Sequence, residues 1–241
     1  MPPDIIISKI VEPEGAPKPP NYRRFWAAVI AASVIYALIV GQDYLRGKWW
    51  EHKIPRVVSA LDANRNGVSD TDDLIAGARL VVKAKPYYRS VYYQGGGYPP
   101  DDEGVCTDLI WRAFKHAGYD LKAMMDKDIR SHVHLYPRVA GQPDPDIDFR
   151  RVPNQMVFFR RHGLSLTREL IPGDAENLAQ WQPGDIVAFK DPDHVVILST
   201  RRNAHGVPWL IHHSTPYPRE ADDFPSRLNR GITGHYRFPK Q

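Results

Sequence analysis

The sequence predicts an α+β protein in which helices come first and an antiparallel sheet follows. Apolar residues recur at helical spacing up to Gly163, whereas short apolar runs separated by turn residues follow one another after Trp181. Helices followed by consecutive strands are typical of the α+β class. With 241 residues, 42% of them apolar, the chain is long enough to build a sizeable core in one or two domains.

The composition narrows the class of partner. A formal net charge of +4 is mild, and the basic residues are interspersed with acidic ones, so we expect no nucleic acid partner. A mildly basic surface suits an anionic bilayer or an anionic polymer better. The single cysteine excludes an intramolecular disulfide but not an extracytoplasmic location.

The N-terminal part predicts a tail and a membrane anchor. Residues 1–21 are rich in proline and carry mixed charges, so we expect a disordered tail. Residues 22–44 predict one transmembrane helix, because Phe25–Val40 contains no charged residue. Aromatic residues suit the two membrane interfaces: Tyr22, Trp26, Tyr44, Trp49 and Trp50. A cleaved signal peptide and a buried core helix are the alternatives.

The orientation of this anchor is expected to leave the short tail inside the cell and the large domain outside. Basic residues lie in nearly equal number on the two sides of the apolar run, so the expectation depends on the function inferred below as much as on charge. The predicted location is the cell membrane, with a single span and an extracytoplasmic domain.

Residues 51–84 predict an EF-hand-like segment. We expect a short helix over 54–61, with Pro55 in its first turn, and a second helix that carries Leu74 and Ala78. Between them, oxygen-bearing side chains at the first, third, fifth, ninth and twelfth positions, with glycine at the sixth, are typical of a calcium loop. The predicted calcium ligands are Asp62, Asn64, Asn66, Asp70, Asp73 and the main-chain carbonyl of Val68.

Two features of this loop bear on its strength as a calcium site. The twelfth position is Asp73 rather than glutamate, and the eighth is Ser69 rather than an aliphatic residue. Both predict weak, extracellular-type affinity. The alternative is a polar loop that only caps the following helix.

The remaining residues, 85–241, predict the main domain. A loop rich in glycine and proline over 92–105 precedes a helix that starts near Cys106 and ends at Gly118. A further helix, capped by Asn154, is expected to end at Gly163. The predicted strands are 185–189, 194–200, 209–214 and 234–238.

One constellation in this domain points to chemistry. Cys106 begins a helix, where main-chain N–H groups favour a thiolate, and the preceding loop is expected to leave it accessible. His194 heads the second predicted strand, and His212 lies on the third. A nucleophile, a base and a third polar group that orients the base are the parts of a thiol hydrolase. The alternative is an inert buried cysteine.

Several motifs together resemble the NlpC-type cysteine peptidases, a papain-like superfamily of bacterial cell-wall enzymes. They are Tyr93-Gln-Gly-Gly, Gly104-Val-Cys106-Thr-Asp, Gln182-Pro-Gly-Asp-Ile-Val, His194-Val-Val-Ile and Leu210-Ile-His212-His-Ser. Gly-Gly-Tyr-Pro-Pro and Gly234-His-Tyr-Arg resemble an uncharacterised branch of it. The sequence departs from the usual pattern at Val105, where an acidic residue is common, and at the small pair that follows Cys106.

The resemblance implies a papain-like fold and a role for each matching residue. Cys106 would be the nucleophile, His194 the base and His212 the orienting residue, with Tyr93 near the thiol. His213 competes with His212, because adjacent strand residues point to opposite faces and only one of them can serve. The implied substrate is an amide bond in the peptide stems of peptidoglycan.

Three functions follow as hypotheses. The leading one is a membrane-anchored, extracytoplasmic cysteine hydrolase. The second is a non-catalytic module that binds cell-wall peptides, and the third is an acyltransferase that passes a thioester to an acceptor other than water.

Overall fold

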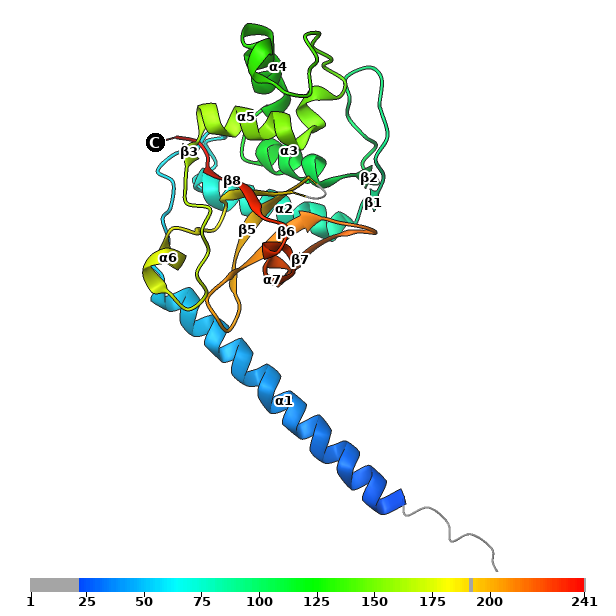
Figure 1. Ribbon diagram of the computed structural model, residues 1–241, viewed down its shortest axis with the longest axis vertical. Helices are drawn as coiled ribbons and strands as arrows, with labels where there is room; N and C mark the ends of the chain where they lie inside the picture. The colour runs from blue at the N-terminus through cyan, green and yellow to red at the C-terminus, as the bar shows by residue number, and fades with distance from the viewer. Residues whose placement is uncertain (1–21, 191–192, 241) are drawn as a thin grey trace, which may run out of the picture. The chain divides into compact units, whose positions relative to one another are not determined.

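The predicted α+β class is confirmed. The structure is a computed structural model that describes residues 22–190 and 193–240, so the predicted disordered tail lies outside the described residues. The chain divides into two compact units, 1–41 and 42–241. Figure 1 shows helices α2, α3 and α5 together on one side of the strands of the second unit.

The helices and strands have the following bounds. The helices are α1 (Tyr22–Lys53), α2 (Asp70–Ala84), α3 (Cys106–His116), α4 (Leu121–Ser131), α5 (Val152–His162), α6 (Ala175–Ala179) and α7 (Phe224–Leu228). Two 3₁₀ turns, η1 and η2, span Val133–Leu135 and Asp148–Arg150. The strands are β1 (Tyr87–Tyr88), β2 (Glu103–Gly104), β3 (Leu164–Ser165), β4 (Ile186–Phe189), β5 (His194–Arg202), β6 (Pro208–His213), β7 (Pro218–Ala221) and β8 (Ile232–Arg237).

Six of these strands form one antiparallel sheet in the order β3-β8-β4-β5-β6-β7. The sheet contains the four strands expected from the sequence, and β7 and the short β3 extend it at its two edges. Strands β1 and β2 form a separate parallel pair. The centre of the sheet is the hairpin of β4 and β5, in which Phe189 faces His194.

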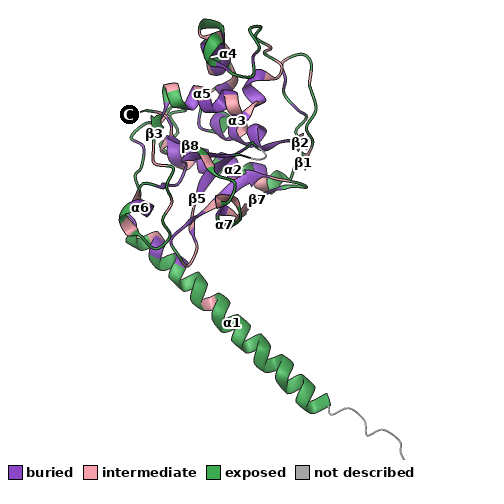
Figure 2. Ribbon diagram, viewed as in Figure 1, coloured by how far each residue is buried: buried purple, intermediate pink, exposed green. Residues whose placement is uncertain are grey.

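The two faces of the sheet bury different cores, as the alternation of strand side chains requires. On β5, Val195 and Ile197 pack with the apolar side chains of α2, α3 and α5. Val196 and Leu198 face the other way, into a second core that contains Trp181 and Phe224. Figure 2 shows much of α3, α5 and β5 as buried segments. Whether a side chain on β5 or β6 lies in the first core or in the second therefore depends on its position in this alternation.

Helix α3 is the central helix of the first core. Its residues Leu109, Ile110, Ala113 and Phe114 are completely buried. Helix α2 lies close against it at Gly77, where an added Cβ would come within 2.6 Å of His116 Cβ. Glycine at this position lets the two helices approach each other, and α2 packs beside α3 on the same face of the sheet.

Helix α1 is one long apolar helix near the N-terminus, of the kind that spans a membrane or serves as a signal sequence. Its most apolar stretch has a mean hydropathy of 1.9, and none of that stretch is buried in the protein. The helix is longer than the predicted anchor and continues to Lys53. Its last turns belong to the second unit, in which Trp50 is buried in the core and its Nε1 donates to Ala204 O at 3.2 Å. The expectation that Trp50 lies at a membrane interface is therefore wrong.

The helix expected over 54–61 is also absent. Residues 54–69 contain no helix, and Val57 and Val58 are about half exposed, at 47% and 51%. Proline disfavours helical geometry in the residue before it and donates no hydrogen bond. Pro55 therefore ends α1 at Lys53 instead of starting a new helix, and the acidic loop has only one flanking helix of its own, α2.

The bounds of α1 generate a test of the anchor. We expect the full-length chain to stay in the membrane pellet after alkaline carbonate washing, because the apolar stretch of α1 is exposed and matches the thickness of the hydrocarbon. The fragment 42–241, which retains Trp50, should be soluble and folded by circular dichroism. Release of the full-length chain by carbonate, or a mature mass that lacks residues 22–41, would show that α1 is not a permanent anchor.

Candidate active site

Cys106 lies at the first position of α3 and faces the sheet. The apolar spacing that buries Ile110 and Ala113 also buries Cys106, whose exposed fraction is 5%. Main-chain N–H groups of Val195, Thr107 and Cys106 itself are directed at the sulfur. The start of α3 and the start of β5 therefore meet at the thiol.

Burial decides the charge of this thiol. Loss of solvent raises the pKa of Cys106 to about 11, and the nearby carboxylate of Asp108 adds to that effect. The main-chain N–H groups act in the opposite direction, but they do not compensate for burial. The expectation of an accessible thiolate at the helix start is therefore wrong for this conformation, in which the thiol is buried and protonated.

Two histidines from adjacent strands touch each other on the face of the sheet that bears Val196 and Leu198. His194, the first residue of β5, and His212, near the end of β6, are both buried. His194 Nε2 lies 2.9 Å from His212 Nδ1, and the rings are perpendicular. The register pairs Ile197 with Ile211, which places both histidines on one face and toward the same end of the two strands.

Asp223 continues this chain of contacts. His212 Nε2 lies 2.8 Å from Asp223 Oδ2, and Arg219 also binds this carboxylate, with its Nε at 2.7 Å from Oδ2. A carboxylate only accepts hydrogen bonds, so His212 carries its proton on Nε2 and its Nδ1 is an acceptor. His194 must then donate through Nε2, and its own Nδ1 is left with a free lone pair. The chain Asp223–His212–His194 thus fixes the tautomer of each ring and leaves a base at its end.

Both rings are neutral in this environment. Burial lowers the pKa of His194 to about 2, and the charge of Arg227 contributes in the same direction. Burial likewise lowers the pKa of His212 to about 4, although the hydrogen bond to Asp223 opposes the shift. Within the residues that the structure describes, His194 and the Cys106 thiol make no hydrogen bond with each other. Val195, the residue after His194, directs its main-chain N–H at the sulfur, but the alternation of β5 puts the His194 ring on the face of Val196, opposite to the face that packs against Cys106.

His213 points to the other face of β6, as the alternation of the strand requires. It is completely buried, and its ring lies 5.3 Å from that of Tyr88 in an edge-on arrangement. Neither ring nitrogen has a hydrogen-bond partner. Burial lowers the pKa of His213 to about 4, while the main chain at Pro86 and Val105 opposes the shift. Of the two adjacent histidines, His212 is the one that the structure brings to His194.

The side chain of Tyr93 is engaged by Glu103 and Arg150. Its hydroxyl donates to Glu103 Oε2 at 2.5 Å, and the guanidinium of Arg150 lies over its ring at 4.9 Å. The tyrosine that senses the charge of Cys106 is Tyr88, whose pKa rises to about 12, mainly through burial and partly through the thiolate. The sequence motif singled out Tyr93 and not Tyr88.

The pair that follows Cys106 in the sequence has a structural explanation. Asp108 is completely buried and accepts from Arg150 Nε at 2.8 Å and from Arg150 Nη2 at 2.9 Å. It also accepts from the main-chain N–H of Val105 and from Trp111 Nε1. Thr107 Oγ1 donates to Arg150 O at 3.0 Å. Thr107 and Asp108 thus fix the start of α3, on which the position of the sulfur depends.

The acidic loop lies at the opposite end of α3. Asn64 and Asn66 direct their amide groups at Asp73 Oδ2, at 2.7 and 3.0 Å, and Asp62 accepts from the main-chain N–H groups of Asn66 and Gly67. Asp70 is buried and accepts from Ala63 N and from the hydroxyl of Tyr119. Four of the predicted ligand side chains therefore gather in one loop, whereas Asp70 is engaged by the protein.

This arrangement fits a calcium ion in part. No group of three acidic, histidine or cysteine side chains in the described part of the chain is spaced to hold a metal. The oxygens of Asp62, Asn64, Asn66 and Asp73 remain as side-chain donors of the type that calcium prefers. Asp70 would have to exchange its hydrogen bond with Tyr119 for the ion.

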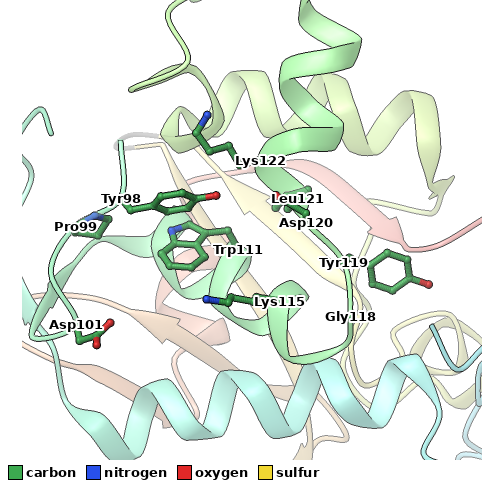
Figure 3. Close-up of a pocket in the computed structure, with 10 residues that line it drawn as sticks. All are labelled: Tyr98, Pro99, Asp101, Trp111, Lys115, Gly118, Tyr119, Asp120, Leu121 and Lys122. Atoms are coloured by element: carbon green, nitrogen blue, oxygen red, sulfur yellow. The ribbon is translucent and has the colours of Figure 1, made fainter. Parts of the chain in front are cut away.

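A pocket of about 590 Å³ lies on the solvent side of α3 (Figure 3). Tyr98 and Trp111 form one wall, with ring centroids 4.8 Å apart, and Lys115 and Lys122 also line it. The pocket contains neither Cys106 nor a histidine. It is therefore separate from the thiol and the histidine pair.

Comparisons with known proteins place the chain in a family. The family described as "Domain of unknown function (DUF1287)" matches residues 75–238, which include Cys106, His194, His212 and Asp223. The chain is also 30% identical over 194 residues to "Uncharacterized protein YijF" of Escherichia coli (strain K12), covering 77% of this chain and 87% of that protein. The protein belongs to the DUF1287 family.

Asp223 and Arg227 are the site residues that sequence reasoning missed. Both lie between the third and fourth predicted strands, in a polar stretch without hydrophobic periodicity, so no pattern marked them. The available signal was the short distance along the chain from His212 to Asp223 and Arg227. A short strand that returns antiparallel after His213, as β7 does, brings the residues that follow it back beside His212. Asp223 follows β7 directly and precedes α7.

The buried neutral histidines generate a prediction on acid stability. An unfolded histidine binds a proton below about pH 6.5, whereas His194, His212 and His213 stay neutral in the fold down to lower pH. The unfolded state then binds more protons, so the stability of the fragment 42–241 should fall as the pH is lowered from about 6.5 toward 4. Urea unfolding at several pH values measures this slope.

The variant His213→Leu should reduce that slope by about one proton, or about 1.4 kcal/mol per pH unit near pH 5. The exposed His205, changed to Gln, provides the matched control and should leave the slope as it is. Equal slopes in the wild type and His213→Leu would show that His213 is protonated in the folded protein.

Proposed function

We propose that the protein is a cysteine hydrolase of amide bonds, with Cys106 as nucleophile, His194 as base and His212 as orienting residue. The single observation that carries the proposal is the hydrogen-bonded chain Asp223–His212–His194, which ends in an unprotonated nitrogen at the start of β5, where the next residue, Val195, directs its main-chain N–H at the Cys106 sulfur. A structural histidine pair has no need of such a defined sequence of donors. A base that must hold one tautomer does need it.

The proposed reaction follows from the tautomers. As the sulfur of Cys106 attacks the carbonyl carbon, its proton passes to His194 Nδ1, and the resulting imidazolium is stabilised through His212 by Asp223. The main-chain N–H at the start of α3 donates to the developing oxyanion. The C–N bond then breaks as the leaving amine takes the proton from His194, and a thioester remains. Water activated by His194 hydrolyses the thioester and regenerates the thiol.

This chemistry requires a closer approach of Cys106 and His194 than the present conformation has. Catalytic hydrogen bonds are often long without substrate and tighten when it binds. The neutral state of both groups fits such a scheme, because the proton is transferred during attack and no ion pair has to be maintained in a buried site beforehand.

The substrate that we propose is an amide bond in a peptidoglycan stem peptide, and the proposed location is the outer face of the cell membrane, with α1 as the anchor. The resemblance to NlpC-type peptidases supports the substrate, and the length and hydropathy of α1 support the anchor. Membrane attachment would keep the domain close to newly made cell wall.

The second candidate is a binding module without turnover, and one observation favours it. Burial raises the pKa of Cys106 to about 11, which is unusual for an active thiol. An acyltransferase is a variant of the first proposal, because the same thioester would pass to an amine acceptor instead of water.

Substitutions at the site separate these functions. In a mass-spectrometric assay with purified muropeptides, Cys106→Ala and His194→Ala should lower turnover to background. His212→Ala and Asp223→Asn should each lower kcat by about 10²–10⁴-fold, because they disturb the tautomer of the base but leave it in place. His205→Gln, at an exposed histidine away from these residues, is the matched control, and it should retain most of the activity.

Circular dichroism should show that each variant is folded. Turnover by Cys106→Ala at the wild-type rate would overturn the hydrolase proposal. Retained muropeptide binding with no turnover in the wild type would favour the binding module, and products extended by an added amine would favour the acyltransferase.

We also propose that the acidic loop binds calcium weakly and thereby stabilises the end of α3. Asn64 Nδ2 donates to His116 O at 3.0 Å, so the loop and the helix end are already connected. With three carboxylates and two amides in the predicted ligand set, the dissociation constant should be about 10⁻⁴ to 10⁻³ M. The ion would have a structural role only.

Calcium binding predicts a rise in the melting temperature of the full chain as calcium increases through the millimolar range, because the ion binds only the folded state. Asp62→Ala should abolish this rise, and Asp101→Asn, an exposed acidic residue outside the loop, should not. If calcium gives no shift at about 10 mM, roughly ten times the upper end of the expected Kd, the loop only caps α2.

A further inference from the structure

Arg227, in the short helix α7, is a cation without an anionic partner beside the proposed site. Its Nη2 lies 3.2 Å from Ser214 Oγ and 3.4 Å from His212 Nδ1. Its Nε is buried and has no hydrogen-bond partner. The side chain makes no ion pair in the described part of the chain, since the nearby Asp223 already binds His212 and Arg219.

This arrangement is energetically costly and therefore informative. A half-buried guanidinium loses hydration, and unpaired donors around it add to the cost. Loss of solvent lowers the pKa of Arg227, and Arg219 and Arg230 contribute repulsion in the same direction. Asp223 opposes this shift from nearby, but its carboxylate is already bound by His212 and Arg219 and makes no ion pair with Arg227.

Arg227 is also close to the reacting groups. The charge of a Cys106 thiolate would raise the pKa of Arg227, and the charge of Arg227 opposes the high pKa of Tyr88. Arg227 also contributes to keeping His194 neutral. The guanidinium therefore acts on the nucleophile, on the base and on the half-buried Tyr88 together.

We propose that Arg227 binds a carboxylate of the substrate, so that the preferred substrate of the Cys106 site carries a free carboxylate close to the bond under attack. The free Nε and the adjacent nitrogens of the fork supply donors that match a carboxylate. The inference rests on the proposed function for its substrate, but the binding of a carboxylate beside Cys106 is a property of the site itself and is testable without turnover.

Two alkylating reagents that differ by one carboxylate test it. Iodoacetate and iodoacetamide both react by attack of the sulfur on the CH₂ carbon, with loss of iodide, and the thiol proton goes to His194 or to solvent. The ratio of their rates at Cys106, the only cysteine, is measured by mass spectrometry on the full chain in a neutral detergent at low salt. N-acetylcysteine gives the intrinsic ratio.

We expect the wild-type ratio of iodoacetate to iodoacetamide to exceed that of N-acetylcysteine by about tenfold, the size of one charge-assisted hydrogen bond. Arg227→Gln should return it to the reference value, and Arg227→Lys should give an intermediate ratio, because the charge remains but the fork is lost. Arg230→Gln, an exposed arginine in the same region, is the matched control and should keep the wild-type ratio.

A wild-type ratio equal to that of N-acetylcysteine would overturn the proposal, as would an equal loss in Arg230→Gln, which would indicate a diffuse field instead of a site. Should Arg227→Gln fail to fold, protection of wild-type Cys106 from iodoacetamide decides the question. N-acetylalanine should protect it and N-acetylalaninamide should not, and equal protection by the two would contradict the proposal. Because none of these measurements needs hydrolysis, their failure and the failure of the hydrolase proposal are distinguishable.

Discussion

The buried ion pair between Asp108 and Arg150 is the interaction on which the geometry around Cys106 depends. Both side chains are almost fully buried, and Asp108 receives four hydrogen bonds, two of them from the guanidinium. A buried ion pair is stable only when its polar atoms are satisfied in this way, and loss of one partner typically costs about 3–5 kcal/mol. The pair fixes the first turn of α3 against the 3₁₀ turn η2.

This fixation has a consequence for the chemistry of the thiol. The carboxylate that anchors the helix start also disfavours a thiolate two residues away. Asp108 therefore fixes the position of Cys106 and at the same time destabilises its thiolate. In the proposed reaction, a nucleophile of this kind depends on a base that is ready to accept its proton, and the tautomer chain from Asp223 through His212 would leave His194 in that state.

The sequence was sufficient to predict much of this framework. Strand patterns located β4, β5, β6 and β8 to within two residues, and the apolar spacing after Cys106 located α3. Alternation along a strand implied that only one of His212 and His213 can face His194, but the choice between them depended on the register of β5 and β6. Register is a tertiary property, and so is the return of the chain through β7 that delivers Asp223 and Arg227.

Other features were ambiguous for local reasons. Proline is favourable in the first turn of a helix and unfavourable after its end, so Pro55 alone is compatible with a new helix or with the end of α1. Tyr88 and Tyr93 occur in similar sequence surroundings, and only the burial of Tyr88 against His213 separates them. The high pKa of Cys106 depends on how completely the surrounding chain excludes water, which no motif encodes.

The two ends of α3 are connected to different parts of the protein. At its start, the ion pair of Asp108 and the two histidine strands define the position of the thiol. At its other end, the acidic loop reaches the helix through Asn64, and the hydroxyl of Tyr119 donates to Asp70. A rigid helix transmits a displacement of either end to the other, so order in the loop restricts where Cys106 can move. For the proposed reaction, the thiol and His194 would still have to approach each other, and with α3 held at both ends the smaller adjustment is that of the histidine at the beginning of β5.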